Sequence, residues 1–88
     1  MYKLVFGSKF LRSAEKLDKR LKLKLKSSLD VLSQNPFHPN LHTKSLSGKL
    51  AGFYSFRLSR DYRVIFELIS SEGVIYLLKV GDRKDIYR

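Results

Sequence analysis

The chain has 88 residues, of which 18 are Lys or Arg and 8 are Asp or Glu, so its formal charge is +10 at pH 7. This length leaves room for one domain, residues 1–88, that buries about 60 to 65 per cent of its unfolded surface. The chain has no cysteine, which excludes disulfide bridges and thiolate metal sites. The strong positive charge favours polyanionic partners.

Targeting signals are missing from the sequence. It contains neither a signal peptide nor a long apolar run. We therefore expect a cytoplasmic protein that does not act at a membrane.

A first strand is expected at residues 2–6, where Tyr2, Leu4 and Phe6 alternate with their neighbours. We expect the hydroxyl of Ser8 to cap a helix over about residues 9–17. The buried stripe of that helix has three members at helical spacing, namely Phe10, Ala14 and Leu17.

The segment of residues 19–35 alternates Leu and Lys between positions 21 and 26, which taken alone is typical of a strand. Over the full segment the leucines follow helical spacing, at Leu21, Leu25, Leu29 and Leu32. We therefore predict an amphipathic helix that begins after an Asp18 cap and ends at Asn35 and Pro36. The two helices form an antiparallel hairpin.

Basic residues are dense on this predicted hairpin. The eight between positions 9 and 26 are Lys9, Arg12, Lys16, Lys19, Arg20, Lys22, Lys24 and Lys26. They indicate a solvated helix face and, in addition, a contact with a polyanion.

A loop punctuated by prolines follows at residues 36–44. His38 and His42 stand four apart in it, but the prolines on both sides of His38 prevent a helix that would align them as metal ligands. We expect both histidines to face solvent or pack the loop, and we expect no metal site.

Three alternating runs, residues 53–58, 61–68 and 74–80, predict an antiparallel meander. Together with the first strand and the hairpin they predict a small two-layer α+β domain of order β-α-α-β-β-β, with the helices on the apolar face of the sheet.

The other face of the predicted sheet carries cations. Alternate positions place five side chains there: Ser55, Arg57, Arg63, Glu67 and Lys79. Arg83 and Tyr87 follow the last strand. Guanidinium groups that converge on one open face suit phosphate, because each can bridge two phosphate oxygens. The alternative is a set of surface arginines paired with nearby carboxylates.

Three segments resemble the RelE/ParE toxin superfamily of bacterial toxin-antitoxin modules: LSGKLAGFYSFRL at 46–58, DYRVIF at 61–66 and VGDRKDIY at 80–87. The resemblance covers nearly the whole chain, and the expected order of elements is also the RelE-like order. It implies a ribosome-dependent mRNA endonuclease without metal or small-molecule cofactor, in which a ribose 2′-OH attacks the adjacent phosphate. It also implies an acidic antitoxin as partner, and contacts of the basic helices with 16S rRNA on the ribosome.

The resemblance also assigns roles to residues. Arg63 matches an arginine that stabilises the transition state, Arg83 one that contacts the leaving group or phosphate, and Tyr87 a general base. Tyrosine can serve as a base where clustered cations stabilise the phenolate. The alternative for Tyr87 is an aromatic that packs on the sheet. The expected phosphate-binding residues are Lys49, Arg57 and Lys79.

Two departures from the RelE pattern keep other functions open. No histidine stands near the C-terminus, and Ser55 stands where that branch often carries a second lysine, which implies weaker substrate holding. The ParE branch uses the same fold to inhibit DNA gyrase without nuclease activity. A third possibility is a basic nucleic-acid-binding module with no enzymatic role, whose affinity would fall steeply with salt.

Overall fold

The computed structural model describes residues 1–87, and position 88 of the expected domain lies outside them. The elements follow in this order: β1 (Lys3–Phe6), α1 (Ser8–Glu15), α2 (Lys19–Gln34), the 3₁₀ helix η1 (Pro39–Leu41), β2 (Lys44–Ser45), η2 (Gly48–Leu50), β3 (Tyr54–Arg57), β4 (Tyr62–Ile69), η3 (Ser70–Glu72) and β5 (Val74–Asp82). The predicted helices and the four predicted strands are all present, with ends shifted by at most two residues.

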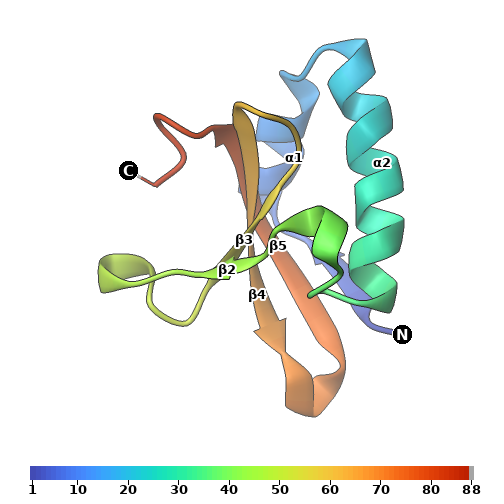
Figure 1. Ribbon diagram of the computed structural model, residues 1–88, viewed down its shortest axis with the longest axis vertical. Helices are drawn as coiled ribbons and strands as arrows, with labels where there is room; N and C mark the ends of the chain where they lie inside the picture. The colour runs from blue at the N-terminus through green and yellow to red at the C-terminus, as the bar shows by residue number, and fades with distance from the viewer. Residues whose placement is uncertain (88) are drawn as a thin grey trace.

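The sheet has five strands in the order β1-β5-β4-β3-β2. Strands β2 to β5 pair antiparallel, whereas β1 runs parallel to β5 with Lys3 opposite Val74. The helix α2 lies on one side of this sheet, and the end of the chain lies on the other (Figure 1). The expected α+β architecture is confirmed, with the short strand β2 as an addition that the sequence pattern did not predict.

The two helix starts differ in how they are capped. Ser8 was expected to cap α1, but the N-cap is Gly7 and no side chain accepts a hydrogen bond there. Ser8 instead occupies the first helical position. The predicted cap of α2 is confirmed, because Asp18 Oδ1 accepts a hydrogen bond of 2.8 Å from the amide of Leu21.

Apolar side chains fill the space between the helices and the sheet. The predicted helix stripes contribute Phe10, Leu17, Leu21, Leu25 and Leu32, all buried. The sheet contributes a second buried set: Phe56, Val64, Phe66, Ile75, Leu77 and Val80. Phe6, expected on the same face of β1 as Tyr2 and Leu4, is 45% exposed, and the centroid of its ring lies 5.9 Å from that of Phe10.

A β-bulge in β5 allows the strand to keep its apolar residues on the helix side. Ile65 of β4 is opposite Lys79, but the next residue, Phe66, is opposite Leu77, so Leu78 has no partner in the register. One extra residue changes the face that the following side chains occupy. Leu77 therefore points to the core together with Val80, and Lys79 remains on the other face.

The junction of β1 and α1 is packed closely against β5. A Cβ at Gly7 would lie 2.6 Å from Tyr76 Oη and 2.9 Å from the carbonyl oxygen of Leu77, so only glycine fits. Nearby, Ser13 Oγ accepts a hydrogen bond of 3.1 Å from the amide of Val80. The side chain of Ser13 thus satisfies a backbone donor of β5 at a position beyond the end of β1.

Residues 83–87, the C-terminal segment, cover part of the face that the helices leave free. Ile86 is buried, and its Cδ1 lies 3.5 Å from the place of a Cβ on Gly81. Ser55 and Ile65, on the same face of β3 and β4, are also buried. The expectation that this face is open is therefore wrong around Ser55, because the turn after β5 folds the chain back over the sheet.

Candidate functional site

A basic groove of about 380 Å³ lies where the ends of β3 and β4 meet the C-terminal segment. We call it the arginine groove. The residues that line it are His42, Lys44, Ser55, Arg57, Arg63, Arg83, Lys84 and Tyr87. Four of the predicted site residues, Arg57, Arg63, Arg83 and Tyr87, are therefore brought together in one place.

Two arginines of the groove lie beside each other on neighbouring strands. Arg57 on β3 is directly opposite Arg63 on β4 in the antiparallel register. Like charges at directly opposite positions destabilise a strand pair. A bound anion between the two guanidinium groups would relieve this repulsion, which makes the pair suitable for phosphate.

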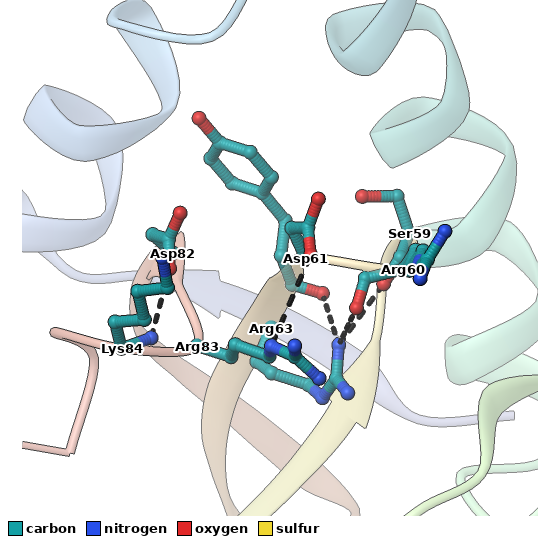
Figure 2. Close-up of polar contacts among 8 residues, drawn as sticks. Ser59, Arg60, Asp61, Arg63, Asp82, Arg83 and Lys84 are labelled. Atoms are coloured by element: carbon teal, nitrogen blue, oxygen red, sulfur yellow. Dashed lines mark hydrogen bonds and ion pairs between the residues drawn. The ribbon is translucent and has the colours of Figure 1, made fainter.

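Arg63 is held in place by the turn between β3 and β4. Its Nη1 donates to the carbonyl oxygens of Ser59 at 3.0 Å, Arg60 at 3.2 Å and Tyr62 at 3.1 Å (Figure 2). These contacts fix the plane of the guanidinium group before any ligand binds. Arg63 therefore has a structural role in the turn as well as a position in the groove.

Arg83 reaches the groove from the end of β5. Its amide donates to the carbonyl oxygen of Asp61 at 2.7 Å, and its Nε lies 3.8 Å from Asp61 Oδ1. The two side chains are 53% and 58% exposed, so this ion pair is weak. Figure 2 shows the guanidinium groups of Arg63 and Arg83 near the start of β4. The weak pair leaves Arg83 available for an anion.

A tight turn sets the position of the C-terminal segment. Asp82 Oδ1 accepts from the amide of Lys84 at 2.8 Å, and the Asp82 carbonyl accepts from the amides of Asp85 and Ile86, both at 2.9 Å. Aspartate commonly organises such turns through its side-chain oxygen. Burial of Ile86 then anchors the segment and places the next residue, Tyr87, over β3.

Tyr87 is joined to the sheet by one hydrogen bond. Its hydroxyl donates to Ser55 Oγ at 3.2 Å, while the residue as a whole is 43% exposed. Ser55 is only 3% exposed. Sequence reasoning treated Ser55 as a departure that weakens substrate holding, and missed it as the contact that orients the Tyr87 ring. The alternation of β3 placed Ser55 on this face, but nothing in the sequence paired it with Tyr87.

The other two predicted phosphate ligands lie apart from the arginine groove. Lys49 lines a neighbouring groove of about 420 Å³ together with Leu46, Ser47, Leu50 and Tyr87. Lys79 is opposite Ile65 in the register and is absent from the described lining of the arginine groove. Tyr87 therefore separates Lys49 from the arginines.

His42 is a lining residue that sequence reasoning left in the loop. It ends η1 with a left-handed backbone, φ 50° and ψ 45°, which is uncommon for a residue other than glycine. His38 packs within the loop instead, where its Nδ1 accepts from the amide of Asn40 at 3.1 Å. No spacing rule reveals which histidine of such a loop turns toward a site.

Two further features bear on function. No helix within residues 1–87 is both long and apolar enough to span a membrane. Among the same residues, no three His, Asp or Glu side chains gather in the way that metal ligands do.

Several solved structures share this fold. YafQ from E. coli strain BL21(DE3) matches with a TM-score of 0.83 at 16% sequence identity, over 100% of both chains. A chain of the archaeal RelE–RelB complex from Pyrococcus horikoshii OT3 matches with a TM-score of 0.81 at 25% identity, over 96% of this chain and 97% of that chain. A chain of the toxin-antitoxin complex RelBE2 from Mycobacterium tuberculosis gives 0.77 and 25%, over 93% and 98%.

The mixed five-stranded sheet with its helical hairpin is the RelE-like fold. The comparison with curated proteins gives no match. The family model of the ParE toxin of the type II toxin-antitoxin system parDE matches residues 4–87. The chain therefore belongs to the ParE toxin family, within the RelE/ParE superfamily of type II toxin-antitoxin systems.

Proposed function

We propose that this toxin is an endoribonuclease that cleaves mRNA on the ribosome. The observation that carries the proposal is that Arg57, Arg63, Arg83 and Tyr87 line one groove. Three guanidinium groups beside one phenol supply charge stabilisation and a proton acceptor at the same place. These are the groups that cleavage of a phosphodiester by its own 2′-OH requires.

In the proposed reaction, Tyr87 reacts as the phenolate, after its own proton has passed to solvent, and takes the proton from the ribose 2′-OH. The 2′-oxygen then bonds to phosphorus, and the bond from phosphorus to the 5′-oxygen breaks. Arg57 and Arg63 stabilise the charge that develops on the equatorial oxygens. Arg83 neutralises the departing 5′-oxygen, which takes a proton from solvent. The products are a 2′,3′-cyclic phosphate and a 5′-hydroxyl, and the reaction needs no metal or other cofactor.

The geometry of Tyr87 supports this role better than a packing role. The hydrogen bond to Ser55 Oγ ties the phenol to β3, yet 43% of the residue remains exposed. Burial in the C-terminal segment is supplied by Ile86 instead. Tyr87 is thus oriented by the fold and still open to a substrate.

The exposed helix surface supports the ribosome as the place of action. All eight basic residues between positions 9 and 26 are exposed on or beside α1 and α2. A surface with this charge binds the phosphate backbone of RNA without sequence preference. We propose that it contacts 16S rRNA and brings the arginine groove to the mRNA.

We also propose an acidic antitoxin as the partner of this chain in the cytoplasm. Two of the matched structures are complexes of a toxin with its antitoxin. The charge of +10 favours an acidic partner segment, and such segments often fold as they bind. A pull-down with the product of the neighbouring gene tests this: failure to bind at micromolar concentration would contradict it.

Gyrase inhibition is the second candidate, because the matching family model is that of the ParE toxin. A gyrase inhibitor would act as a binding protein, so the arginine groove would not need Tyr87. Expression would then cause DNA breaks and an SOS response while mRNA stays intact.

One experiment separates the two. Wild type, Tyr87→Phe and the control Tyr62→Phe are induced in a sensitive bacterium, and primer extension is run on a translated reporter mRNA. Tyr62 lies on the helix side of the sheet, so its variant controls for loss of a tyrosine hydroxyl. Discrete cleavages that disappear only in Tyr87→Phe are expected. Growth arrest with intact mRNA in the wild type would instead favour gyrase.

A further inference from the structure

A second groove, of about 650 Å³, continues the arginine groove toward α2. We call it the helix groove. Four residues line both grooves: His42, Arg57, Arg63 and Arg83. The remaining residues of the helix groove come from α2, from η1 and from the turn between β3 and β4. The two grooves therefore form one continuous track across the arginine cluster.

The lining of the helix groove combines charge with apolar surface. Lys24 and Arg60 add two cations beyond the shared arginines, and no acidic residue is among its described lining residues. Its neutral hydrogen-bonding side chains are Ser27, Ser28, Ser59 and Asn40, and its apolar ones are Val31, Leu41 and Leu58. This mixture suits a single-stranded nucleic acid, because its phosphates need cations and its unpaired bases need apolar and hydrogen-bonding contacts.

His42 stands where the two grooves meet. Its left-handed backbone is costly for a residue with a side chain and persists only because the surrounding structure fixes it. The amide of His42 donates to the carbonyl of Pro39 at 3.3 Å, which closes η1 at that residue. The conformation thus keeps an imidazole beside the arginines, between the Tyr87 end and the Lys24 end of the track.

We propose that the helix groove binds the RNA segment adjoining the cleaved phosphate. The strand lies with its reactive phosphate between Tyr87 and the arginines, passes His42, and continues along α2 to Lys24 and Arg60. This rests on the proposed nuclease function, and it assigns a substrate-binding role to Lys24, Arg60 and His42. It predicts that affinity grows with RNA length until the track is filled.

The test uses 2′-O-methyl RNA, which cannot react, so that binding is measured without cleavage. A hexamer and a trimer are titrated with full-length wild type, Lys24→Ala and Lys3→Ala by fluorescence anisotropy. Lys3 is an exposed residue of β1, at the opposite edge of the sheet, and its loss removes the same charge. The hexamer is expected to bind Lys24→Ala about fivefold more weakly than Lys3→Ala, with a salt slope reduced by about 0.7. The trimer, held at the arginines, is expected to bind both alike.

Equal weakening by Lys24→Ala and Lys3→Ala would overturn the proposal, because the effect would then be one of net charge. Tighter binding of duplex DNA than of the hexamer would overturn it as well. Failure of the proposed function is detected in a separate experiment. If the Tyr87→Phe variant still cleaves mRNA, the proposed nuclease mechanism is wrong, independently of how the hexamer binds.

Discussion

The two faces of the sheet carry different kinds of side chain. On the helix side the cross-strand rows are apolar, with Tyr54 opposite Phe66 and Phe56 opposite Val64. On the other side the neighbouring rows place Arg57 opposite Arg63 and Ser55 opposite Ile65. The first face carries most of the apolar core, whereas the second face combines the buried Ile65 with a repulsive pair of arginines. Alternation thus allows one strand to contribute to the apolar core on one face and to the arginine groove on the other.

The largest effect on this comparison is expected from Phe66→Ala, which truncates a fully buried ring. Loss of such a side chain leaves a cavity and costs about 3–5 kcal/mol of the free energy of unfolding. Urea denaturation measures it. The control is Glu67→Ala, at the next position on the other face, where a change near 0.5 kcal/mol is expected. Equal losses for both would show that the faces do not differ.

Arg63→Lys tests the other face with the charge retained. Lysine lacks the planar fork that holds two phosphate oxygens, so cleavage is expected to fall about 100- to 1,000-fold. The three bonds to the turn carbonyls are lost as well, which lowers stability by about 1 kcal/mol. Single-turnover cleavage and thermal melting are measured on the same preparation. Full activity in this variant would reduce Arg63 to its role in the turn.

Gly7→Ala tests the packing of β1 on β5, remote from the arginine groove. The added methyl would lie 2.6 Å from Tyr76 Oη and 2.9 Å from a carbonyl oxygen, and we expect a loss of about 1–3 kcal/mol in stability. Gly81→Ala is the control, since its methyl meets only Ile86 Cδ1 at 3.5 Å. Removal of the hydroxyl in Gly7→Ala/Tyr76→Phe should recover part of the loss. No loss in Gly7→Ala would mean that the junction relaxes freely.

The smallest effect is expected from Ser55→Ala, which removes the partner of Tyr87. Water can replace the bond because Tyr87 is partly exposed, so stability should change by about 0.5–1.5 kcal/mol. Cleavage is expected to fall about tenfold in kcat with little change in KM, and Ser55→Thr should restore part of it. The exposed Ser45→Ala serves as control. An unchanged kcat would show that Ser55 does not position Tyr87.

Much of the fold was predictable because long periodic segments determine it. The leucines of α2 and the alternation of β4 each specify one buried face, and Asp18 caps α2 as expected. The strand β2 was not predicted, because Lys44 and Ser45 are polar and too few to show a period. The bulge at Leu78 was not predicted for a related reason. Leu78 is apolar like most of its neighbours, so the extra residue does not disturb the apolar pattern of the strand.

The candidate site was predicted in part. Alternation and resemblance placed Arg57, Arg63 and Tyr87 near each other, since strand register determines faces. The placement of Ser55 beneath Tyr87 depends on the turn at Asp82, a tertiary feature with no local period. Lys49 and Lys79 share the charge of the arginines, but charge alone does not say which groove a side chain enters.

The parallel pairing of β1 with β5 has a consequence for how the molecule forms. These partners are separated by almost the entire chain, and contacts between distant segments slow folding because a long loop must close first. During synthesis β1 has no partner until β5 has been made. Arg83 and Tyr87 follow β5, so they reach Arg57 and Arg63 only after the sheet closes. An unfinished chain therefore has Arg57 and Arg63 but lacks Tyr87. The complete groove forms only when the end of the chain has been made.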